Sequence, residues 1–165
     1  MSFKLTTGYT PGAIGRMAEL HASYYSRCWN FGMFFEAKVA TDMSAVLQRY
    51  TAGTDGFWTV VSNKTVEGGI AIDGARAADE GAHLRWFIMS DALRHQGAGN
   101  LLMTTALDFC RGIGHPSVYL WTFDGLIPAR HLYEKFGFKL VEEHPGDQWG
   151  TRVTEQKFVL DFTAR

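Results

Sequence analysis

Residues 83–112 have the sequence HLRWFIMSDALRHQGAGNLLMTTALDFCRG. The first seven residues, His83–Met89, are mostly aromatic or branched, which favours a β-strand. A helical pattern follows, with apolar and small side chains at Leu101, Leu102, Thr105, Ala106 and Phe109. Between the two lies a turn that contains Gly97 and Gly99. This order predicts a strand, a glycine-containing turn and a helix that ends at Gly112 or Gly114.

Strands and helices are also predicted on both sides of this unit. Further strands are expected at Phe3–Tyr9, Phe57–Ser62, Val66–Asp73, Ser117–Phe123, Phe138–Val141 and Val153–Phe162. Three further helices are expected: one that Thr10 caps and Pro11 begins, one that carries Val39–Tyr50 and ends by Gly53, and one over Pro128–Phe136. Asn63-Lys64 suits a hairpin turn, and Gly74–Gly81 suits a loop. The expected fold class is α/β (α+β): one mixed sheet of about seven strands flanked by about four helices, in a single domain over residues 1–165.

Composition and charge exclude several classes of protein. The chain has 165 residues, of which 46% are hydrophobic and 20% charged, as in soluble globular proteins. Sixteen Lys and Arg against seventeen Asp and Glu give a net charge of −1, which provides no basic field for nucleic acid. Neither a membrane span nor a signal-peptide pattern occurs, so the cytoplasm is the expected location. Cys28 and Cys110 lack metal-ligand spacing, so we expect no metal and two small buried hydrophobic residues.

The turn Arg94–Asn100 has the properties of an anion site. Its glycines allow backbone amides to approach a ligand closely, and the first turn of the following helix has unpaired N–H groups. The helix dipole adds to their attraction for a pyrophosphate. A dinucleotide-binding fingerprint is disfavoured because Leu102 stands where a third glycine is needed. A P-loop is disfavoured because Gly99 is followed by Asn100 and Leu101 instead of Lys and Ser or Thr.

A second motif narrows the interpretation of the glycine turn. Residues 94–99 fit R-x-x-G-x-G, and residues 129–138 fit A-x-x-L-Y-x-x-x-G-F. In this order, each at a strand-to-helix connection, the pair resembles the GNAT superfamily of acyl-CoA-dependent N-acyltransferases.

A narrower resemblance covers nearly the whole chain. His21–Tyr25, Phe35–Ala40, Leu84–Phe87 and Glu155–Phe158 look like the GNAT half of bacterial proteins that fuse this domain to a MarR-type regulator. The chain has no room for the winged-helix half. The resemblance therefore implies a free-standing acetyltransferase domain without DNA contacts of its own.

The superfamily resemblance implies acetyl-CoA as the co-substrate. In that family two strands diverge around the pantetheine, so the backbone of Phe87, Ile88 and Met89 is expected to pair with the pantetheine amides. A main-chain N–H near Phe87 or Ile88 is expected to polarise the thioester carbonyl. The residues expected around the pyrophosphate and nearby phosphate charge are Arg94, His95, Gln96, Gly97, Ala98, Gly99, Asn100, Ala129, Arg130 and Lys135.

The resemblance also implies roles in proton transfer. Tyr133 occupies the family's tyrosine position and is expected to protonate the departing CoA thiolate. His83 stands where related acetyltransferases have a glutamate or histidine, and its ordinary pKa near 6.5 suits proton removal near neutral pH. Alternatively, His83 has no catalytic role and only forms a hydrogen bond with a neighbouring group. Glu36 is an alternative base, or a carboxylate that binds the amine. Leu126 stands where many members have an asparagine, which puts that side-chain contact with the pantetheine in doubt.

The acceptor is expected beside the first two helices. Its candidate contacts are Tyr24, Tyr25, Trp29, Phe31, Phe34, Phe35, Glu36 and Arg85, and Trp149-Gly150 is expected either to cover this pocket or to pack on the sheet. Alternation along the strand is expected to place Arg85, Phe87 and Met89 on the same face as His83. The aromatic residues suit an apolar or aromatic amine, although such a stripe is also typical of a core.

These expectations combine into one function with two alternatives. The chain is expected to transfer an acetyl group from acetyl-CoA to a primary amine of a small molecule, directly within a ternary complex. The alternatives are acetylation of a protein lysine or N-terminus, and a non-catalytic acyl-CoA sensor. No nucleic acid or membrane partner is expected, and a homodimer is possible because dimers are common among similar proteins.

Overall fold

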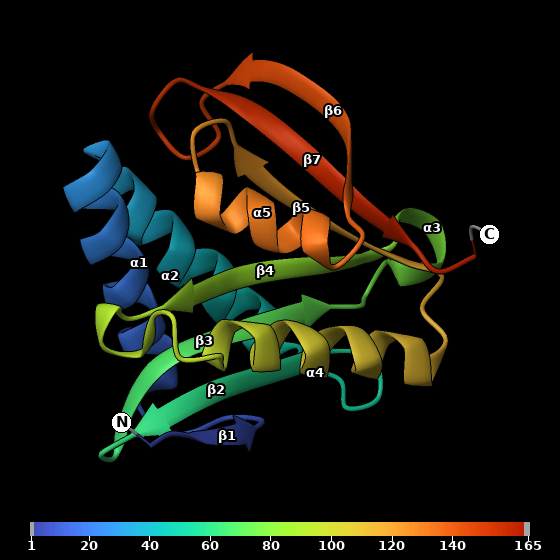
Figure 1. The fold of residues 1–165 in the computed structure, drawn as a ribbon, viewed down its shortest axis with the longest axis horizontal. Helices are drawn as coiled ribbons and strands as arrows, with labels where there is room; N and C mark the ends of the chain where they lie inside the picture. The colour runs from blue at the N-terminus through green and yellow to red at the C-terminus, as the bar shows by residue number, and fades with distance from the viewer. Residues whose placement is uncertain (1, 164–165) are drawn as a thin grey trace.

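Figure 1 shows the computed structural model of the protein, which describes residues 2–163. Among these residues, seven strands form one sheet in the order β1-β2-β3-β4-β5-β7-β6. The strands are β1 (Lys4–Thr7), β2 (Gly56–Ser62), β3 (Thr65–Asp73), β4 (Ala82–Met89), β5 (Ser117–Phe123), β6 (Lys139–Gly146) and β7 (Val153–Asp161). The helices are α1 (Ala13–Trp29), α2 (Met33–Gln48), α3 (Ala77–Glu80), α4 (Ala98–Ile113) and α5 (Ile127–Lys135), with a short 3-10 helix η1 (Asp91–Leu93) before α4. The predicted α/β class with a mixed sheet is confirmed.

The sheet changes character between β4 and β5. Every other neighbouring pair is antiparallel, whereas β4 and β5 are parallel. They pair only at their beginnings, Ala82 with Val118 and His83 with Tyr119. Beyond His83 the two strands diverge, and Figure 1 shows the gap widening toward their carboxyl ends. The β5-facing edge of β4 is therefore open along the rest of the strand.

Helices cover both faces of the sheet and create two apolar cores. One core packs α4 and α5 against the sheet and contains Leu102, Leu107, Tyr133 and Phe158. The other packs α1 and α2 against the opposite face and contains Met17, Val39 and Phe123 among its members. The β4–β5 gap lies between these two cores.

A bulge in β4 changes which side chains share a face. Trp86 has a left-handed φ of 55°, and the register with β3 shifts between Ala71–Arg85 and Gly69–Ile88. Phe87 and Met89 consequently pack with the α4 core, as Leu84 does, whereas Trp86 and Ile88 pack with the α1/α2 core. The predicted common face is therefore wrong for Phe87 and Met89, because simple alternation does not survive a bulge.

Several boundaries also differ from the prediction. The first helix begins at Ala13 behind Gly12, whose φ is 89°, so Thr10 and Pro11 form a turn instead of the cap and first residue. The second helix begins at Met33, well before Val39. The predicted loop at Gly74–Gly81 contains α3. By contrast, Asn63 and Lys64 make the expected hairpin turn, both with positive φ.

Two further findings concern exposure. Cys110 is buried, as expected, but Cys28 is exposed on α1, which contradicts the prediction for that residue. None of the helices described here is long and apolar enough to cross a membrane.

Candidate functional site

A cavity of about 130 Å³ lies where β4 and β5 diverge. Leu84, Phe87 and Tyr133 reach it from the α4 and α5 side, and His21, Phe35 and Asp42 reach it from the α1 and α2 side. The complete lining is His21, Tyr25, Phe35, Lys38, Val39, Asp42, His83, Leu84, Arg85, Trp86, Phe87, Leu120, Trp121, Thr122, Phe123, Leu126, Tyr133, Gln148 and Trp149. Side chains from both faces of the sheet therefore meet around one cavity.

The N-terminus of α4 adjoins the open end of this gap. Gly97 precedes the helix with a φ of 84° and provides no side-chain cap. The first helical hydrogen bond there runs from the N–H of Leu101 to the oxygen of Gly97, at 3.0 Å, so the preceding N–H groups have no partner within the helix. A Cβ built at Gly97 meets nothing within 4 Å. The arrangement fits the predicted anion site.

The cationic side chains around this turn differ in what they contact. Lys135 of α5 donates to Oδ1 of Asn100 at 2.7 Å, which places an ammonium group beside the start of α4. Arg94 instead lies over the ring of Tyr24 and 3.4 Å from Asp91, and it donates to the oxygen of Met89. Of these two cations, Lys135 is therefore the one that lies at the helix entrance.

Arg130, the third predicted cation, is engaged within its own helix. Its Nε donates to Glu134 at 2.6 Å, and its guanidinium lies 5.5 Å from the ring centre of Phe158. Neither contact involves α4.

Tyr133 projects from α5 into the cavity and is only 8% exposed. Burial raises the pKa of its hydroxyl well above the ordinary value. Within residues 2–163 the hydroxyl has no hydrogen-bond partner, although its ring packs near Phe138 and Phe158. A protonated hydroxyl without a protein partner is available to a ligand.

His83 lines the cavity at the end where β4 and β5 still pair. Its ring stacks on Tyr119 at 4.4 Å, and burial together with the nearby charge of Arg85 lowers its pKa to about 3. Phe87 lies four residues further along β4, roughly 12 Å at the rise of a strand. Because its pKa is about 3, the expectation that His83 titrates near neutral pH is wrong, and its imidazole is neutral at pH 7.

His21 is a second histidine in the cavity, and no role in the chemistry was predicted for it. Its Nδ1 lies 2.7 Å from the carbonyl oxygen of Met17, and because a carbonyl only accepts, Nδ1 carries the proton. Burial lowers the pKa of His21 to about 4, so Nε2 holds a lone pair at neutral pH. Nε2 has no partner in the described part of the chain and can accept a hydrogen bond from a ligand.

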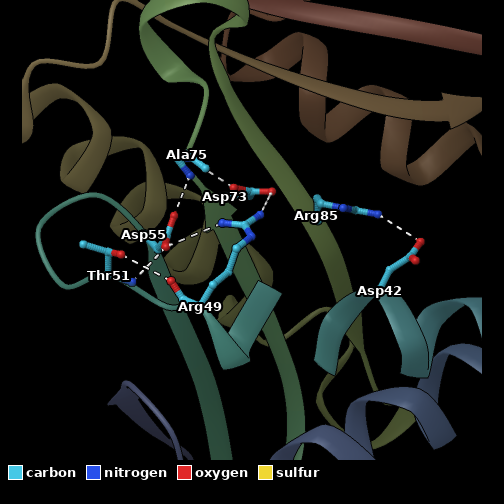
Figure 2. A network of polar contacts seen from close by, with 8 residues as sticks. Asp42, Arg49, Thr51, Asp55, Asp73, Ala75 and Arg85 are labelled. Atoms are coloured by element: carbon cyan, nitrogen blue, oxygen red, sulfur yellow. Dashed lines mark hydrogen bonds and ion pairs between the residues drawn. The ribbon is translucent and has the colours of Figure 1, made fainter. Parts of the chain in front are cut away.

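A charged group lies on the α2 side of the cavity (Figure 2). Arg85 reaches from β4 to Oδ2 of Asp42 at 3.3 Å, and Lys38 contacts the same oxygen at 3.1 Å. Lys38 and Asp42 were not among the predicted acceptor contacts. Their signal in the sequence is an i, i+4 ion pair, which is common on solvent-exposed helices and does not indicate a cavity.

The predicted acceptor residues divide into two groups. Tyr25, Phe35 and Arg85 line the cavity, and so does Trp149. The others do not: Phe31 is buried in the core, Phe34 and Glu36 are exposed, Tyr24 packs against Arg94, and Trp29 packs against Phe123. The helix face predicted from periodicity thus contains both core and cavity residues.

Comparisons with known proteins agree with this arrangement. A sequence model described as "Acetyltransferase (GNAT) family" matches residues 14–138. Human N-acetyltransferase 8 is 27% identical over 110 residues, which are 64% of this chain and 48% of that protein. Human N-acetyltransferase 8B is 27% identical over 124 residues, or 73% and 55%. The chain spans about half the length of these curated relatives.

Solved structures share the fold. A GNAT-family acetyltransferase from Staphylococcus aureus has a TM-score of 0.78 at 16% identity, covering 98% of this chain and 100% of that one. An acetyltransferase from Salmonella typhimurium, solved with acetyl-CoA, has a TM-score of 0.76 at 13% identity, covering 100% and 96%. At these identities the likeness concerns the fold alone.

Proposed function

The chain belongs to the acetyltransferase (GNAT) family, and from this premise we propose that it transfers an acetyl group from acetyl-CoA to a primary amine of a small molecule. The observation that carries the proposal is the cavity between β4 and β5, which residues of α1, α2 and α5 help to line and whose residue Phe87 lies beside Gly99 at the start of α4. Its volume of about 130 Å³ favours a small acceptor over a protein segment.

The α4 side has the groups that acetyl-CoA needs. The free N–H groups at the start of α4 and the ammonium of Lys135 suit the pyrophosphate. The open edge of β4 from Phe87 to Met89 can pair with pantetheine amides as an added strand would. A backbone N–H at the bulge, at Phe87 or Ile88, would polarise the carbonyl. When bound, acetyl-CoA supplies the activated thioester carbonyl.

The reaction transfers two protons in addition to the acetyl group. The amine nitrogen bonds to the carbonyl carbon, the carbon–sulfur bond breaks, and the electron pair of that bond stays on sulfur. In the proposal Tyr133 gives its proton to the sulfur and regains one from solvent. Its raised pKa keeps the hydroxyl protonated until a strong base such as a thiolate forms beside it.

The second proton leaves the amine nitrogen. We infer that the amine binds in its neutral form, because Lys38 and Arg85 already place two positive charges on the lining. The lone pair of His21 Nε2 can then accept a hydrogen bond from the amine and orient it. We propose that the departing proton passes to a water molecule, and that His83, whose pKa of about 3 makes it a weak base, orients this water by accepting a hydrogen bond.

The likeness to the GNAT half of MarR–GNAT fusions rests on the short segments quoted above. We also propose a cytoplasmic location, a single domain over residues 1–165 and a homodimer, all of which agree with the resemblance to the family. An acyl-CoA sensor is the second candidate function, and Leu126 at the start of α5 is the feature that favours it.

Titration calorimetry with acetyl-CoA followed by a CoA-release assay tests the proposed function. We expect acetyl-CoA to bind and at least one amine of a panel of aromatic, aliphatic and peptide amines to release CoA. Binding without release across the panel would favour the sensor. Absence of acetyl-CoA binding by folded protein would contradict both candidates.

A further inference from the structure

The charged residues of the cavity are not balanced. Lys38 and Arg85 contact the single oxygen Oδ2 of Asp42, which is the only carboxylate in the lining. The remaining ionisable side chains that could carry charge near neutral pH are His21 and His83, and both are neutral because burial lowers their pKa values to about 4 and 3. The carboxylate of Glu155 accepts hydrogen bonds from the backbone and side-chain N–H groups of Gln148, one at each oxygen. Glu155 does not line the cavity. The lining therefore has a net charge of +1.

Arg85 has donors that the described protein does not use. A guanidinium has five N–H groups, and among residues 2–163 Asp42 is its hydrogen-bond partner through one of them. The group also stacks on Trp86 at 4.3 Å, which fixes its plane. Burial lowers the pKa of Arg85, so the carboxylates of Asp42 and Asp73 together offset only part of the cost of enclosing this charge.

A second arginine on the same side of the sheet provides a contrast (Figure 2). Arg49 lies 2.7 Å from Asp73 and 4.0 Å from Asp55, so one cation faces two carboxylates. Backbone N–H groups of Thr51 and Gly74 donate to Asp55. None of these residues lines the cavity, and here two carboxylates face one cation, whereas in the cavity Arg85 and Lys38 share the one carboxylate of Asp42.

We propose that the acceptor carries a carboxylate close to its amine, as an α-amino acid does, and that Arg85 and Lys38 bind this carboxylate. The inference rests on the proposed function and specifies its substrate class. Arg85 lies two residues before Phe87, roughly 6 Å along the strand, so the carboxylate can meet the guanidinium while the amine lies near the bulge. Tyr25, Phe35 and Trp149 then leave room for an apolar or aromatic side chain.

Two pairs of compounds that differ only in the carboxylate test this inference. L-phenylalanine and phenethylamine are compared in the CoA-release assay. N-acetyl-L-phenylalanine and N-acetylphenethylamine are compared by calorimetry in the presence of CoA, which reports on recognition even without turnover. We expect the wild type to prefer the carboxylate-bearing member of each pair by about tenfold or more.

Two variants move this preference in opposite directions. Arg85→Gln should reduce the preference to less than about threefold. Asp42→Asn should increase it, because both cations then turn to the ligand. Arg49→Gln removes the matched arginine outside the cavity and should leave it unchanged. A merely structural Arg85–Asp42 pair would instead make both variants weaken binding of both compounds alike.

The outcomes separate this inference from the proposed function. Equal binding of the two acetylated compounds, binding of neither, or a preference that survives Arg85→Gln would overturn the carboxylate inference while CoA release from another amine leaves the transferase intact. A preference for the carboxylate in the binding experiment, with no CoA release from any amine, would support the anion site and contradict the transferase.

Discussion

The two sides of the β4–β5 gap are built from different parts of the chain. On the α4 side the groups proposed to contact acetyl-CoA are mostly backbone amides, and they come from one continuous segment of β4, the glycine turn and the start of α4. On the α1 and α2 side the groups are side chains from both helices, β4, β5 and the connection between β6 and β7. One side depends on local conformation, and the other depends on how distant elements pack together.

This difference explains what each side can be used for. Backbone amides recognise a group that many relatives share, because they require only glycine and helix geometry. Side chains from separate elements can change one at a time without disturbing the sheet, which allows the acceptor to differ between relatives. Substitutions on either side of the gap can break this division of roles.

Tyr133→Phe should lower kcat by about 100-fold and leave the Kd for acetyl-CoA nearly unchanged. The hydroxyl has no protein partner among the described residues, so its removal should cost little stability. Steady-state kinetics and calorimetry measure the two effects. Tyr119→Phe, on β5 outside the cavity lining, is the control. If kcat and affinity fell together, Tyr133 would be a packing residue.

His21→Asn should remove part of the acid sensitivity of the fold. The pKa of His21 falls from 6.5 when unfolded to about 4 when folded, so the unfolded state binds more protons and stability decreases as pH falls between these values. At pH 5 the loss in the wild type from this one group is about 2 kcal/mol relative to pH 7.

Urea unfolding at pH 7 and pH 5 measures this difference. The asparagine amide can still donate to Met17, so the variant should lose less stability over the same interval. The exposed histidine variant His131→Asn should behave as the wild type. An identical acid loss in His21→Asn would show that the imidazole is not kept neutral by burial.

Gly97→Val should weaken acetyl-CoA binding about tenfold, because a branched residue at positive φ shifts the amides at the helix start. Gly114→Val is a matched control: it lies at the other end of α4, also has a φ of 84° and also has open space at Cβ. Both variants should lose similar stability, about 1–2 kcal/mol. Equal loss of affinity in both would mean that helix strain, and not the anion site, accounts for the effect.

His83→Asn should lower kcat only a few-fold and leave the shape of the kcat profile between pH 6 and 8 unchanged. The reason is that the pKa of His83, about 3, lies outside that interval. A histidine with an ordinary pKa near 6.5 would instead contribute an ionisation between pH 6 and 8. Rates across the pH range check this. Loss of an ionisation between pH 6 and 8 in the variant would contradict the desolvation of His83.

How far the sequence predicts the site depends on the same division. The glycine turn, α4 and Ser117–Phe123 lie where local patterns place them, because turn geometry and period-two burial act over a few residues. The faces of β4 were predicted wrongly beyond Arg85, because one residue with positive φ at Trp86 reverses the alternation. Cys28 was predicted as buried and is exposed, because periodicity alone does not fix the limits of a helix's buried face.

The mixed sheet, the glycine turn before α4 and the resemblance to the family were all predicted from the spacing of glycine, apolar and aromatic residues along the chain. Tertiary structure alone decided which side chains meet at the acceptor side. Lys38, Asp42 and Arg85 form one group only because the fold brings α2 beside β4. His21 has a free lone pair on Nε2 because its Nδ1 donates its proton to the carbonyl of Met17. Contacts between elements far apart in the chain follow from packing, which no local pattern encodes.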